Sequence, residues 1–290
     1  MDRDMGCSIV IPAYNEEDGL GDTLTQLKAV LDSAHMDYEI IVVDDGSTDR
    51  TAAVASMHDV RLLRHMENRG YGAALKTGIR QAVHDIVIIT DADQTYPCEA
   101  VPQLLEYADS HDMVVGSRTG DDVQIPVARL PAKKLINALA NMMTGRNIPD
   151  LKSGLRLFRR SIVERFFAIL PDGFSFTTTI TLAMLQSNYS VRYVPIDYRK
   201  RAGQSKIRPI RDTVRFVFLI LRCTVYFAPL RVFVPVSLFL LVLGIAVALI
   251  STFVLKRLMD VTTVVILLAA LQVAMSGLLA DMIDKRTSRL

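Results

Sequence analysis

The 290-residue chain has no tryptophan, only three cysteines, and no excess of either sign of charge. Cys7, Cys98 and Cys223 are scattered and lack a C-x-x-C spacing, which excludes a disulfide framework and a cysteine zinc site and suits a reducing compartment. Lysine plus arginine number 33 against 31 aspartate plus glutamate, so the global basic field of a nucleic-acid-binding protein is absent. Charged residues still make up 22% of the chain, which excludes general disorder.

Apolar residues form half of the chain and are concentrated near its C-terminal end. Residues 232–255 and 261–280 contain no charged side chain. As helices they would be about 36 and 30 Å long, enough to cross a hydrocarbon core of about 30 Å. Only residues 256–260 separate the two runs, so we expect a tight antiparallel transmembrane hairpin. The alternative is two core helices of a soluble protein.

Positive charges flank this hairpin on both sides, whereas the turn between the runs carries only Lys256 and Arg257. The positive-inside rule therefore predicts a multi-pass protein of the cell (inner or plasma) membrane with its N-terminal region and both termini in the cytoplasm. The N-terminus begins with Met-Asp-Arg-Asp, and the apolar run that follows is too short for a signal peptide. The flanking residues are Arg208, Arg211, Arg215, Arg222 and Arg231 before the hairpin, and Lys285, Arg286 and Arg289 after it.

Residues 208–222 predict a helix that lies in the membrane interface. The first four of the flanking arginines fall within about 60° of one another on a helix, and residues 216–221 between them are apolar. The guanidinium groups would meet lipid phosphates while the aromatic side chains enter the acyl region. A soluble helix with a solvated arginine stripe is the alternative.

Short apolar runs alternate with amphipathic segments of about 12 residues through the first 116 residues. This alternation implies right-handed crossovers and a mostly parallel, Rossmann-like α/β sheet that is covered on both faces. In such a sheet, ligands bind beyond the carboxyl ends of the strands. The expected strands are residues 8–12, 39–43, 60–63, 86–90 and 113–116, and the expected helices are 17–31, one starting near 48, 72–83 and 97–108.

Polar side chains cluster at three of the expected strand ends, in residues 15–16, 44–45 and 91–93. Asp91 and Asp93 form a DXD motif whose carboxylates can converge on one Mg²⁺ or Mn²⁺, with a diphosphate filling other positions. Asp45 is placed to accept hydrogen bonds from a base or ribose. Its alternative role, which does not exclude the first, is a helix N-cap in Asp-Gly-Ser-Thr.

These motifs together resemble the inverting family 2 glycosyltransferases with the GT-A fold. The motifs shared with the family as a whole are Pro12–Glu16, Val43–Asp49, Asn68–Ala74 and Asp91–Asp93. The motifs similar to its polyprenyl-phosphate branch are Gly116–Arg118, Asp150–Arg156 and Arg201–Lys206. That branch includes dolichol-phosphate mannose synthases and bactoprenol glucosyltransferases, and some members end in a two-helix membrane hairpin. The resemblance covers about residues 7–206.

The resemblance implies a metal-dependent enzyme that moves a single hexose from a nucleotide-diphosphate sugar to undecaprenyl or dolichyl phosphate, with inversion, on the cytoplasmic membrane face. Arg201 and Lys206 would clamp the donor phosphates, and two cations with a metal can neutralise a diphosphate leaving group. The resemblance places Pro12, Tyr14, Glu16, Val43 and Asp45 around the nucleoside, and Asp91, Ala92 and Asp93 at the diphosphate and metal. Mannose synthases often have glutamine where this chain has Thr95, with Gln94 one position early, so either residue is open as a third metal contact.

The acceptor side needs cations more than a strong base, because a lipid phosphate is already an anion near neutral pH. By resemblance, Arg118 and Arg129 would hold that phosphate. Arg129 opens a stretch that we expect to enter a membrane-proximal helix; an ordinary basic helix start is the alternative. Asp150, a candidate catalytic residue, would orient groups near the acceptor or pair with Arg156. The five histidines, at positions 35, 58, 65, 84 and 111, show no ligand spacing and are expected at the surface or at strand ends.

Two other functions were weighed. A processive polysaccharide synthase would carry Gln-x-x-Arg-Trp, which a chain without tryptophan cannot contain. A non-catalytic subunit that binds nucleotide sugar or lipid is opposed by the joint presence of Asp91, Asp93, Arg201 and Lys206. Gly244 and Gly277 could pack between protomers of a homo-oligomer, and a downstream flippase is a compatible partner. The expected division is a catalytic domain (1–206), juxtamembrane helices (207–231), the hairpin (232–280) and a cytoplasmic tail (281–290).

Overall fold

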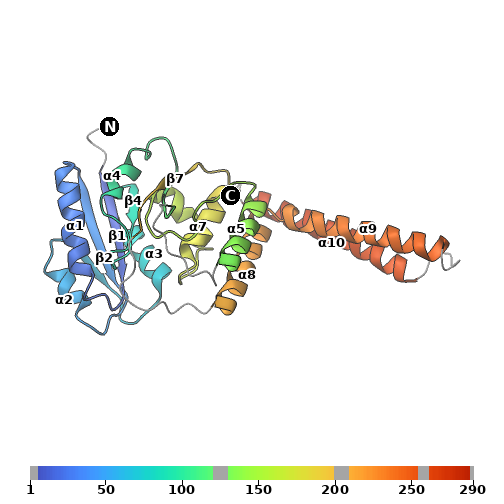
Figure 1. Ribbon diagram of the computed structural model, residues 1–290, viewed down its shortest axis with the longest axis horizontal. Helices are drawn as coiled ribbons and strands as arrows, with labels where there is room; N and C mark the ends of the chain where they lie inside the picture. Colours follow the sequence, from blue (N-terminus) through green and yellow to red (C-terminus); the bar gives the residue numbers. More distant parts are fainter. Residues whose placement is uncertain (1–5, 120–129, 199–208, 254–260, 288–290) are drawn as a thin grey trace.

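The computed structural model describes residues 6–119, 130–198, 209–253 and 261–287. Figure 1 shows an α/β domain from which two long helices project side by side. The strands are β1 (Cys7–Ala13), β2 (Tyr38–Asp44), β3 (Arg61–Arg64), β4 (Ile86–Ile89), β5 (Met113–Ser117), β6 (Arg156–Arg159) and β7 (Val191–Pro195). The helices are α1 (Leu20–Ser33), α2 (Thr51–Ser56), α3 (Tyr71–Gln81), α4 (Ala100–Leu105), α5 (Leu130–Thr144), α6 (Arg160–Val163), the 3₁₀ helix η2 (Glu164–Phe166), α7 (Phe176–Gln186), α8 (Pro209–Phe227), α9 (Leu230–Phe253) and α10 (Val261–Thr287).

The described strands form one seven-stranded sheet in the order β3-β2-β1-β4-β6-β5-β7. Only β6 runs antiparallel to its neighbours, so the predicted mostly parallel sheet is confirmed. The sequence analysis found the first five strands and missed β6 and β7. The alternation of apolar runs and amphipathic segments was followed only through residue 116, and both missed strands lie beyond it.

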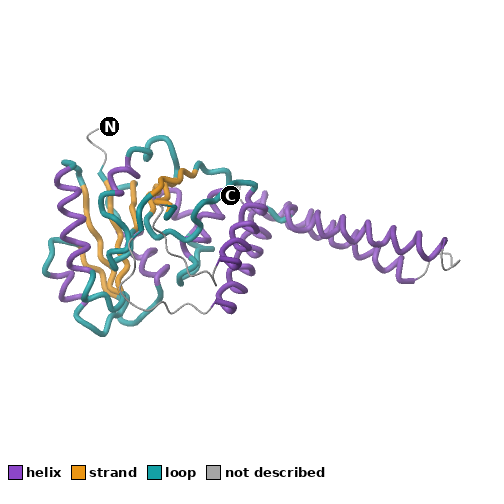
Figure 2. The backbone as a smooth tube through the Cα atoms, in the orientation of Figure 1, coloured by secondary structure: helices purple, strands orange, loops and turns teal. Residues whose placement is uncertain are grey.

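Alternating side chains of the central strands fill two cores, one on each face of the sheet. In β1, Ile9 and Ile11 pack beneath α1 and α4, whereas Val10 between them packs beneath α3 and α7. β2 and β4 alternate in the same way, as the period of two in a strand requires. The result is a three-layer α/β/α domain, with helices on both sides of the strands (Figure 2).

The parallel register brings three strand ends together. Pro12 of β1 lies opposite Val43 of β2, and Val10 of β1 lies opposite Ile89 of β4. The segments that follow these strands therefore emerge side by side at one edge of the sheet. This edge carries all three polar clusters that the sequence analysis singled out.

The helices α9 and α10 form an antiparallel hairpin with small residues on their facing sides. A Cβ at Gly244 would lie 2.7 Å from the Leu267 side chain, and one at Gly277 would lie 2.5 Å from that of Phe233. The two glycines therefore pack within one chain, and packing of the hairpin helices between protomers stays a prediction. Small side chains let the two helix backbones approach closely. The buried positions, spaced by seven residues in each helix, are Gly244 and Ser251 in α9 and Thr263, Ala270 and Gly277 in α10.

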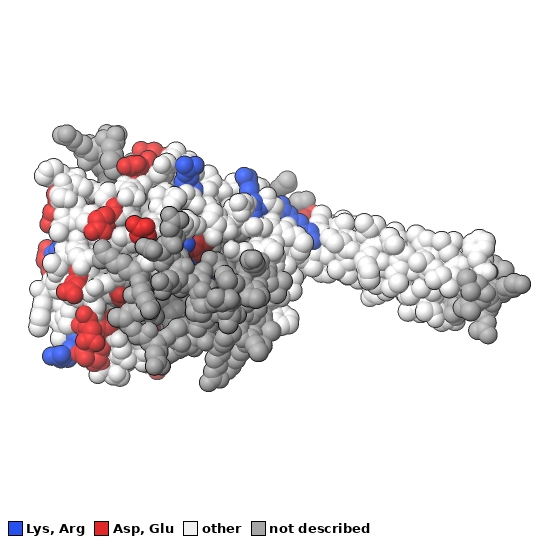
Figure 3. Space-filling model, in the orientation of Figure 1, with Lys and Arg blue, Asp and Glu red and all other residues white. Residues whose placement is uncertain are grey.

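The rest of the hairpin surface is apolar and exposed. Both helices are long and apolar enough to cross a membrane, and only 6% and 17% of their most apolar windows are buried within the structure. A core helix of a soluble protein would be mostly buried. On the face shown in Figure 3, the hairpin carries almost no charged side chain along its projecting length. These features support association of the hairpin with a membrane.

Helices α5 and α8 lie side by side between the sheet and the hairpin (Figure 1). Ile220 and Cys223 of α8 are buried in a third core shared with α5 and α7. Phe218 and Tyr226, on another face of α8, are 67% and 53% exposed, and Arg222 is exposed beside them. A helix with exposed aromatic and cationic side chains next to an apolar hairpin fits the predicted amphipathic interfacial helix.

Gly277→Val should force the hairpin helices apart, because a Cβ at this position overlaps the Cβ of Phe233. We expect a cost of about 1–3 kcal/mol, the usual range for overpacking a tight contact. Thermal unfolding of the detergent-solubilised protein measures this effect. Leu278→Val, at an exposed neighbouring position, is the matched control and should change the melting temperature little. Equal melting temperatures for the two variants would contradict the packing.

Candidate active site

The two aspartates of the DXD motif each have one carboxylate oxygen held by a hydroxyl group. The Tyr71 hydroxyl donates to Asp91 Oδ1 over 2.9 Å, and the Thr95 hydroxyl donates to Asp93 Oδ1 over 2.6 Å. Burial, and then the neighbouring Asp91 charge, raise the pKa of Tyr71 well above its ordinary value, so this phenol remains a donor. Both aspartates lie in the turn that directly follows β4, and each is partly exposed.

Gln94 and Thr95, the two candidates for a third metal contact, each have a hydrogen-bond partner within the protein. Thr95 is 1% exposed, and its hydroxyl binds Asp93. Gln94 has a left-handed backbone with φ of 60°, and its amide donates to Asp22 Oδ2 over 3.0 Å. Thr95 therefore supports Asp93, whereas Gln94 anchors the turn to α1.

Asp45 is buried at the end of β2 and binds a loop that comes much later in the chain. Its carboxylate accepts hydrogen bonds from the main-chain N–H groups of Arg69 and Gly70, at 3.0 and 2.7 Å. His65 Nδ1 lies 2.6 Å from Asp45 Oδ1, and His65 Nε2 lies 2.9 Å from the Thr77 hydroxyl. The helix-cap role weighed for Asp45 is wrong, because Asp49 Oδ1 accepts the bond from the Thr51 N–H at the start of α2. Contact of Asp45 with a base or ribose stays a prediction.

The remaining predicted nucleoside residues lie at the same edge with different exposure. Tyr14 is 44% exposed just beyond β1, and Glu16 is partly exposed two residues later. Val43 is fully buried beneath α3, and Pro12 lies opposite it, also buried. Asn15 has a φ of 55°, and its side-chain oxygen accepts a hydrogen bond from the Thr48 N–H, which ties the loops after β1 and β2 together. Ala92 is likewise buried, so Pro12, Val43 and Ala92 would meet a ligand mainly through their main chains.

Arg118 and Asp150 form a two-point ion pair at the end of β5. Arg118 Nε donates to Asp150 Oδ2 over 2.7 Å and Nη2 donates to Oδ1 over 2.9 Å. Burial alone would raise the pKa of Asp150, but the hydrogen bonds and charge of Arg118 hold it below its ordinary value. Of the two roles expected for Asp150, pairing with Arg156 is wrong: the Arg156 guanidinium donates to Ser153 O, Leu151 O and the Thr181 hydroxyl.

Two tyrosines connect this ion pair to the DXD turn. The Arg118 guanidinium lies over the Tyr198 ring, 5.1 Å from its centroid, and Tyr198 meets Tyr96 edge to face at 5.3 Å. Tyr96 Oη in turn accepts a hydrogen bond from the Gly154 N–H over 2.6 Å. Arg118, Asp150 and the DXD aspartates are therefore parts of one packed site.

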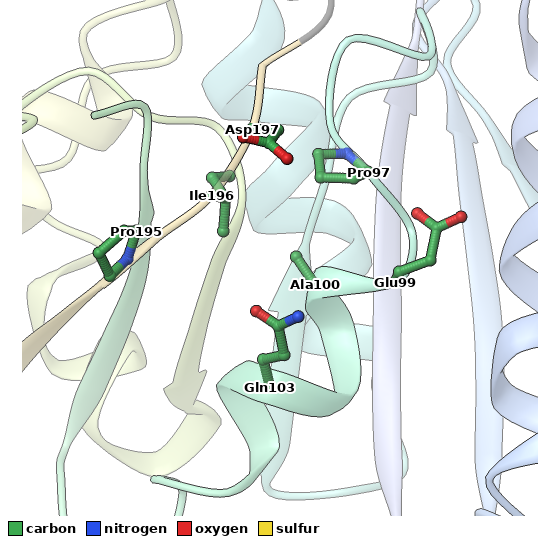
Figure 4. A pocket seen from close by; sticks show the side chains of 7 residues that line it. All are labelled: Pro97, Glu99, Ala100, Gln103, Pro195, Ile196 and Asp197. Carbon is green, nitrogen blue, oxygen red and sulfur yellow. The ribbon is translucent and has the colours of Figure 1, made fainter. Parts of the chain in front are cut away.

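A cavity of about 430 Å³ lies beside the DXD turn, between the start of α4 and the end of β7. Figure 4 shows the carboxylates of Glu99 and Asp197 at its rim. Arg129, Arg201 and Lys206 lie outside the described residues, so their predicted contacts with phosphates stay predictions. The lining residues are Pro97, Glu99, Ala100, Gln103, Pro195, Ile196 and Asp197.

The chemistry of the donor set fits a hard divalent cation that is shared with a ligand. Among the described residues, no group of three or more histidine, cysteine, aspartate or glutamate side chains is placed to hold a metal. Asp91 and Asp93 offer two carboxylates, each oriented by a hydroxyl donor. Mg²⁺ commonly uses one or two carboxylates and takes its other ligands from substrate phosphates and water. A cation bound here would depend on the diphosphate for a large part of its coordination.

Sequence reasoning missed His65, Tyr71, Tyr96 and Tyr198 as parts of the site. Tyr71 lies inside the quoted motif Asn68–Ala74, and His65 was correctly expected at a strand end, but neither received a partner. Their partners Asp91 and Asp45 are 20 residues away in the chain. The only available signal was a polar aromatic residue directly after a glycine at a helix start, which is too common to indicate a contact.

The Asp150→Asn variant should lose about 3 kcal/mol of stability at pH 7, because it leaves the Arg118 charge without its partner. The pKa of Asp150 is lower in the folded state than its ordinary 3.8, so its stabilisation is complete above that value. It is lost as the pH falls through 3.8 towards the folded pKa, since the unfolded chain takes up the proton first. Thermal unfolding at several pH values should therefore show the gap to wild type closing below about pH 4. Asp59→Asn, which removes a carboxylate from an exposed pair with Lys28, is the control. A difference in melting temperature between Asp150→Asn and wild type that stays the same at every pH would refute the ion-pair account.

Comparison with known proteins identifies both parts of the chain. The sequence model for glycosyl transferase family 2 matches residues 8–167, and that for the GtrB C-terminal hairpin matches residues 228–285. An undecaprenyl-phosphate 4-deoxy-4-formamido-L-arabinose transferase of Pseudomonas fluorescens is 34% identical over 83% of this chain and 71% of its own length. A dolichyl-phosphate hexose transferase of Haloferax volcanii is 31% identical over 70% of this chain and 86% of its own length. The undecaprenyl-phosphate 4-deoxy-4-formamido-L-arabinose transferase of Edwardsiella ictaluri is 39% identical over 54% of this chain and 50% of its own length.

Solved structures share the fold. Glucosyl-3-phosphoglycerate synthase from Mycobacterium tuberculosis, crystallised with Mn²⁺, UDP and glucosyl-3-phosphoglycerate, has a TM-score of 0.60 at 22% identity over 76% of this chain and 80% of its own. Mannosyl-3-phosphoglycerate synthase from Rubrobacter xylanophilus has a TM-score of 0.59 at 22% identity over 76% of this chain and 72% of its own. The expected GT-A-like fold is therefore confirmed. The chain belongs to glycosyl transferase family 2, and its residues 228–285 match the GtrB C-terminal hairpin.

Proposed function

We propose that this glycosyltransferase moves a single hexose from a nucleotide-diphosphate sugar to a polyprenyl phosphate, undecaprenyl or dolichyl, with inversion and with Mg²⁺ or Mn²⁺. The relatives from Pseudomonas fluorescens and Haloferax volcanii, by name, transfer sugars to such lipid phosphates. The observation that carries the proposal is one packed site on a domain that continues into an apolar hairpin. That site joins the DXD aspartates to the Arg118–Asp150 pair.

On the donor side, the nucleoside lies against the ends of β1 and β2, near Tyr14 and Asp45. Asp91 and Asp93 hold the cation, which when bound supplies positive charge to the diphosphate leaving group. Arg201 and Lys206 add two more positive charges to the same phosphates. A preorganised site of this kind stabilises the charge that develops as the bond to the sugar breaks.

On the acceptor side, Arg118 and Arg129 hold the lipid phosphate in line with the anomeric carbon. Arg118 uses its Nε N–H and one N–H of Nη2 for Asp150, so its other N–H groups remain as donors for a phosphate. Asp150 thus acts by orienting Arg118. The phosphate oxygen is itself an anion and attacks without a strong general base.

The hairpin and α8 support a reaction that takes place at a membrane. The acceptor's prenyl chain stays in the bilayer, and the water-soluble donor reaches the strand edge from the cytoplasm. Basic residues on both outer flanks of the hairpin support a cytoplasmic catalytic domain and cytoplasmic termini. The exposed Phe218, Arg222 and Tyr226 of α8 support contact with the interface.

Asp93→Asn should lower sugar transfer by at least about a hundredfold, the scale of losing one preorganised transition-state contact. The fold should persist, because Asp93 is a partly exposed strand-end residue. The measurement is transfer from radiolabelled UDP- and GDP-hexoses into a product extracted with organic solvent. Asp109→Asn, at an exposed position away from the strand edge, is the control. Undiminished transfer in the Asp93 variant, or in excess chelator, would overturn the metal assignment.

We expect one pair of basic residues, Arg201 and Lys206, to act in donor binding only. The other pair, Arg118 and Arg129, should act on the acceptor only. Lys206→Ala should weaken nucleotide-sugar affinity, measured by calorimetry without lipid, by about ten- to a hundredfold, as expected for one lost charge-assisted phosphate contact. Arg118→Ala should leave that affinity nearly unchanged while slowing transfer to polyprenyl phosphate. Equal loss of donor affinity in both variants, or normal transfer by the Arg118 variant, would contradict the two-subsite arrangement.

A further inference from the structure

The hydrogen bond from Tyr71 to Asp91 joins the first residue of α3 to the first DXD aspartate. The Tyr71 hydroxyl donates to Asp91 Oδ1 over 2.9 Å, and Asp91 makes other contacts as well. The second aspartate receives its hydroxyl from Thr95, two residues along the same turn. Asp91 instead depends on a residue from a different element of the fold.

The backbone around Tyr71 is held from both sides. Gly70, directly before it, has a φ of 103°, and its N–H donates to the buried Asp45 carboxylate. A Cβ at Gly70 would lie 2.5 Å from the carbonyl oxygen of Asp172, so a larger residue does not fit there. The Ala73 N–H donates to that same carbonyl oxygen over 3.0 Å. The first turn of α3 is thereby clamped between the end of β2 and the loop before α7.

The ring of Tyr71 is packed against another aromatic ring. Phe174 stacks on it with 5.6 Å between ring centroids and 18° between ring planes. The loop that carries Phe174 is tied to α3 by Lys76, whose ammonium lies 2.8 Å from Asp172 Oδ1. The hydroxyl therefore reaches Asp91 from a ring with little freedom to move.

The Asp91 carboxylate also lies close to the main chain of Gly154. A Cβ at Gly154 would lie 2.7 Å from Asp91 Oδ2. Gly154 is itself fixed by its hydrogen bond to Tyr96. The Asp91 carboxylate thus has a hydroxyl donor on Oδ1 and the main chain of Gly154 packed closely beside it, and both contacts restrict how it can turn.

We propose that Tyr71 is a positioning residue, which presents the Asp91 carboxylate to the divalent cation of the nucleotide-sugar site. This inference rests on the proposed function, because it takes the cation as given and assigns the residue that prepares its ligand. Carboxylates that bind metals are commonly held by hydrogen bonds from outer residues, and loss of such a bond costs about 10–100-fold in metal affinity. Tyr71 acts on the cation only through Asp91.

The variant that isolates this role is Tyr71→Phe, which removes one oxygen and keeps the ring that stacks on Phe174. Its matched control is Tyr38→Phe, which removes a phenol that donates to Asp32 Oδ1 over 2.7 Å at an exposed site outside the strand edge. Gly154→Ala is the second variant, because its new methyl group would crowd the Asp91 carboxylate while the Tyr71 hydroxyl is kept. The full chain is used in detergent, and thermal unfolding checks that each variant is folded.

Binding of Mn²⁺ is measured by the loss of the free-ion electron paramagnetic resonance signal, in the presence of UDP or GDP. We expect Tyr71→Phe and Gly154→Ala to bind Mn²⁺ about 10–100-fold more weakly than wild type, and Tyr38→Phe to match wild type. In transfer assays, the Mn²⁺ concentration for half-maximal rate should rise by the same factor for Tyr71→Phe. The rate at saturating Mn²⁺ should approach that of wild type, which a general structural defect would not allow.

The possible results distinguish a failure of this inference from a failure of the proposed function. Wild-type Mn²⁺ affinity in folded Tyr71→Phe overturns the positioning role and leaves the proposed function standing. If only Gly154→Ala binds Mn²⁺ more weakly than wild type, the close contact with Gly154 orients Asp91 and the Tyr71 hydrogen bond does not. A wild-type protein that binds no Mn²⁺ with either nucleotide overturns the metal part of the proposed function, and this inference with it.

Discussion

The buried carboxylate of Asp45 needs hydrogen-bond donors, and the arrangement of the site follows from where it finds them. A buried acceptor without partners is costly, and a buried charge is costlier still. Asp45 takes its donors from Arg69 N and Gly70 N and lies 2.6 Å from His65 Nδ1. The connection from β3 to α3 must therefore fold back over the end of β2. This decides where α3 begins, and hence where the Tyr71 hydroxyl meets Asp91.

The parts of the structure that depend on local pattern were predictable from the sequence. Short apolar runs identified β1 to β5 to within a few residues, because the central strands β1, β2 and β4 are buried on both faces beneath helices. The uncharged runs identified the hairpin because a helix in hydrocarbon tolerates few charges along its length. The position of Asp91 and Asp93 after a central strand followed from the topology of parallel sheets. These features need no knowledge of which distant residues meet.

The parts that depend on distant partners were not predictable. Arg156 is six residues from Asp150 and Arg118 is 32 residues away, so sequence distance favours the wrong pair. Arg156 instead lies fully buried, where carbonyl groups and Thr181 satisfy its donors. The same limit applies to Gly277, whose neighbour Phe233 is known only once the hairpin has closed. A small residue at a helix interface does not reveal whether the facing helix belongs to the same chain.

The proposed reaction joins a water-soluble donor to a lipid, so the catalytic domain must be held at a set place relative to the hairpin. Arg231, in the first turn of α9, donates a hydrogen bond to the carbonyl oxygen of Met143 near the C-terminal end of α5. A cation is favourable there because the carbonyl groups at a helix C-terminus carry partial negative charge. Ile220 of α8 and Val232 of α9 pack into the same core as Ile136 and Ala140 of α5. One polar contact and one apolar core thus attach the hairpin to α5, and through α5 to the rest of the domain.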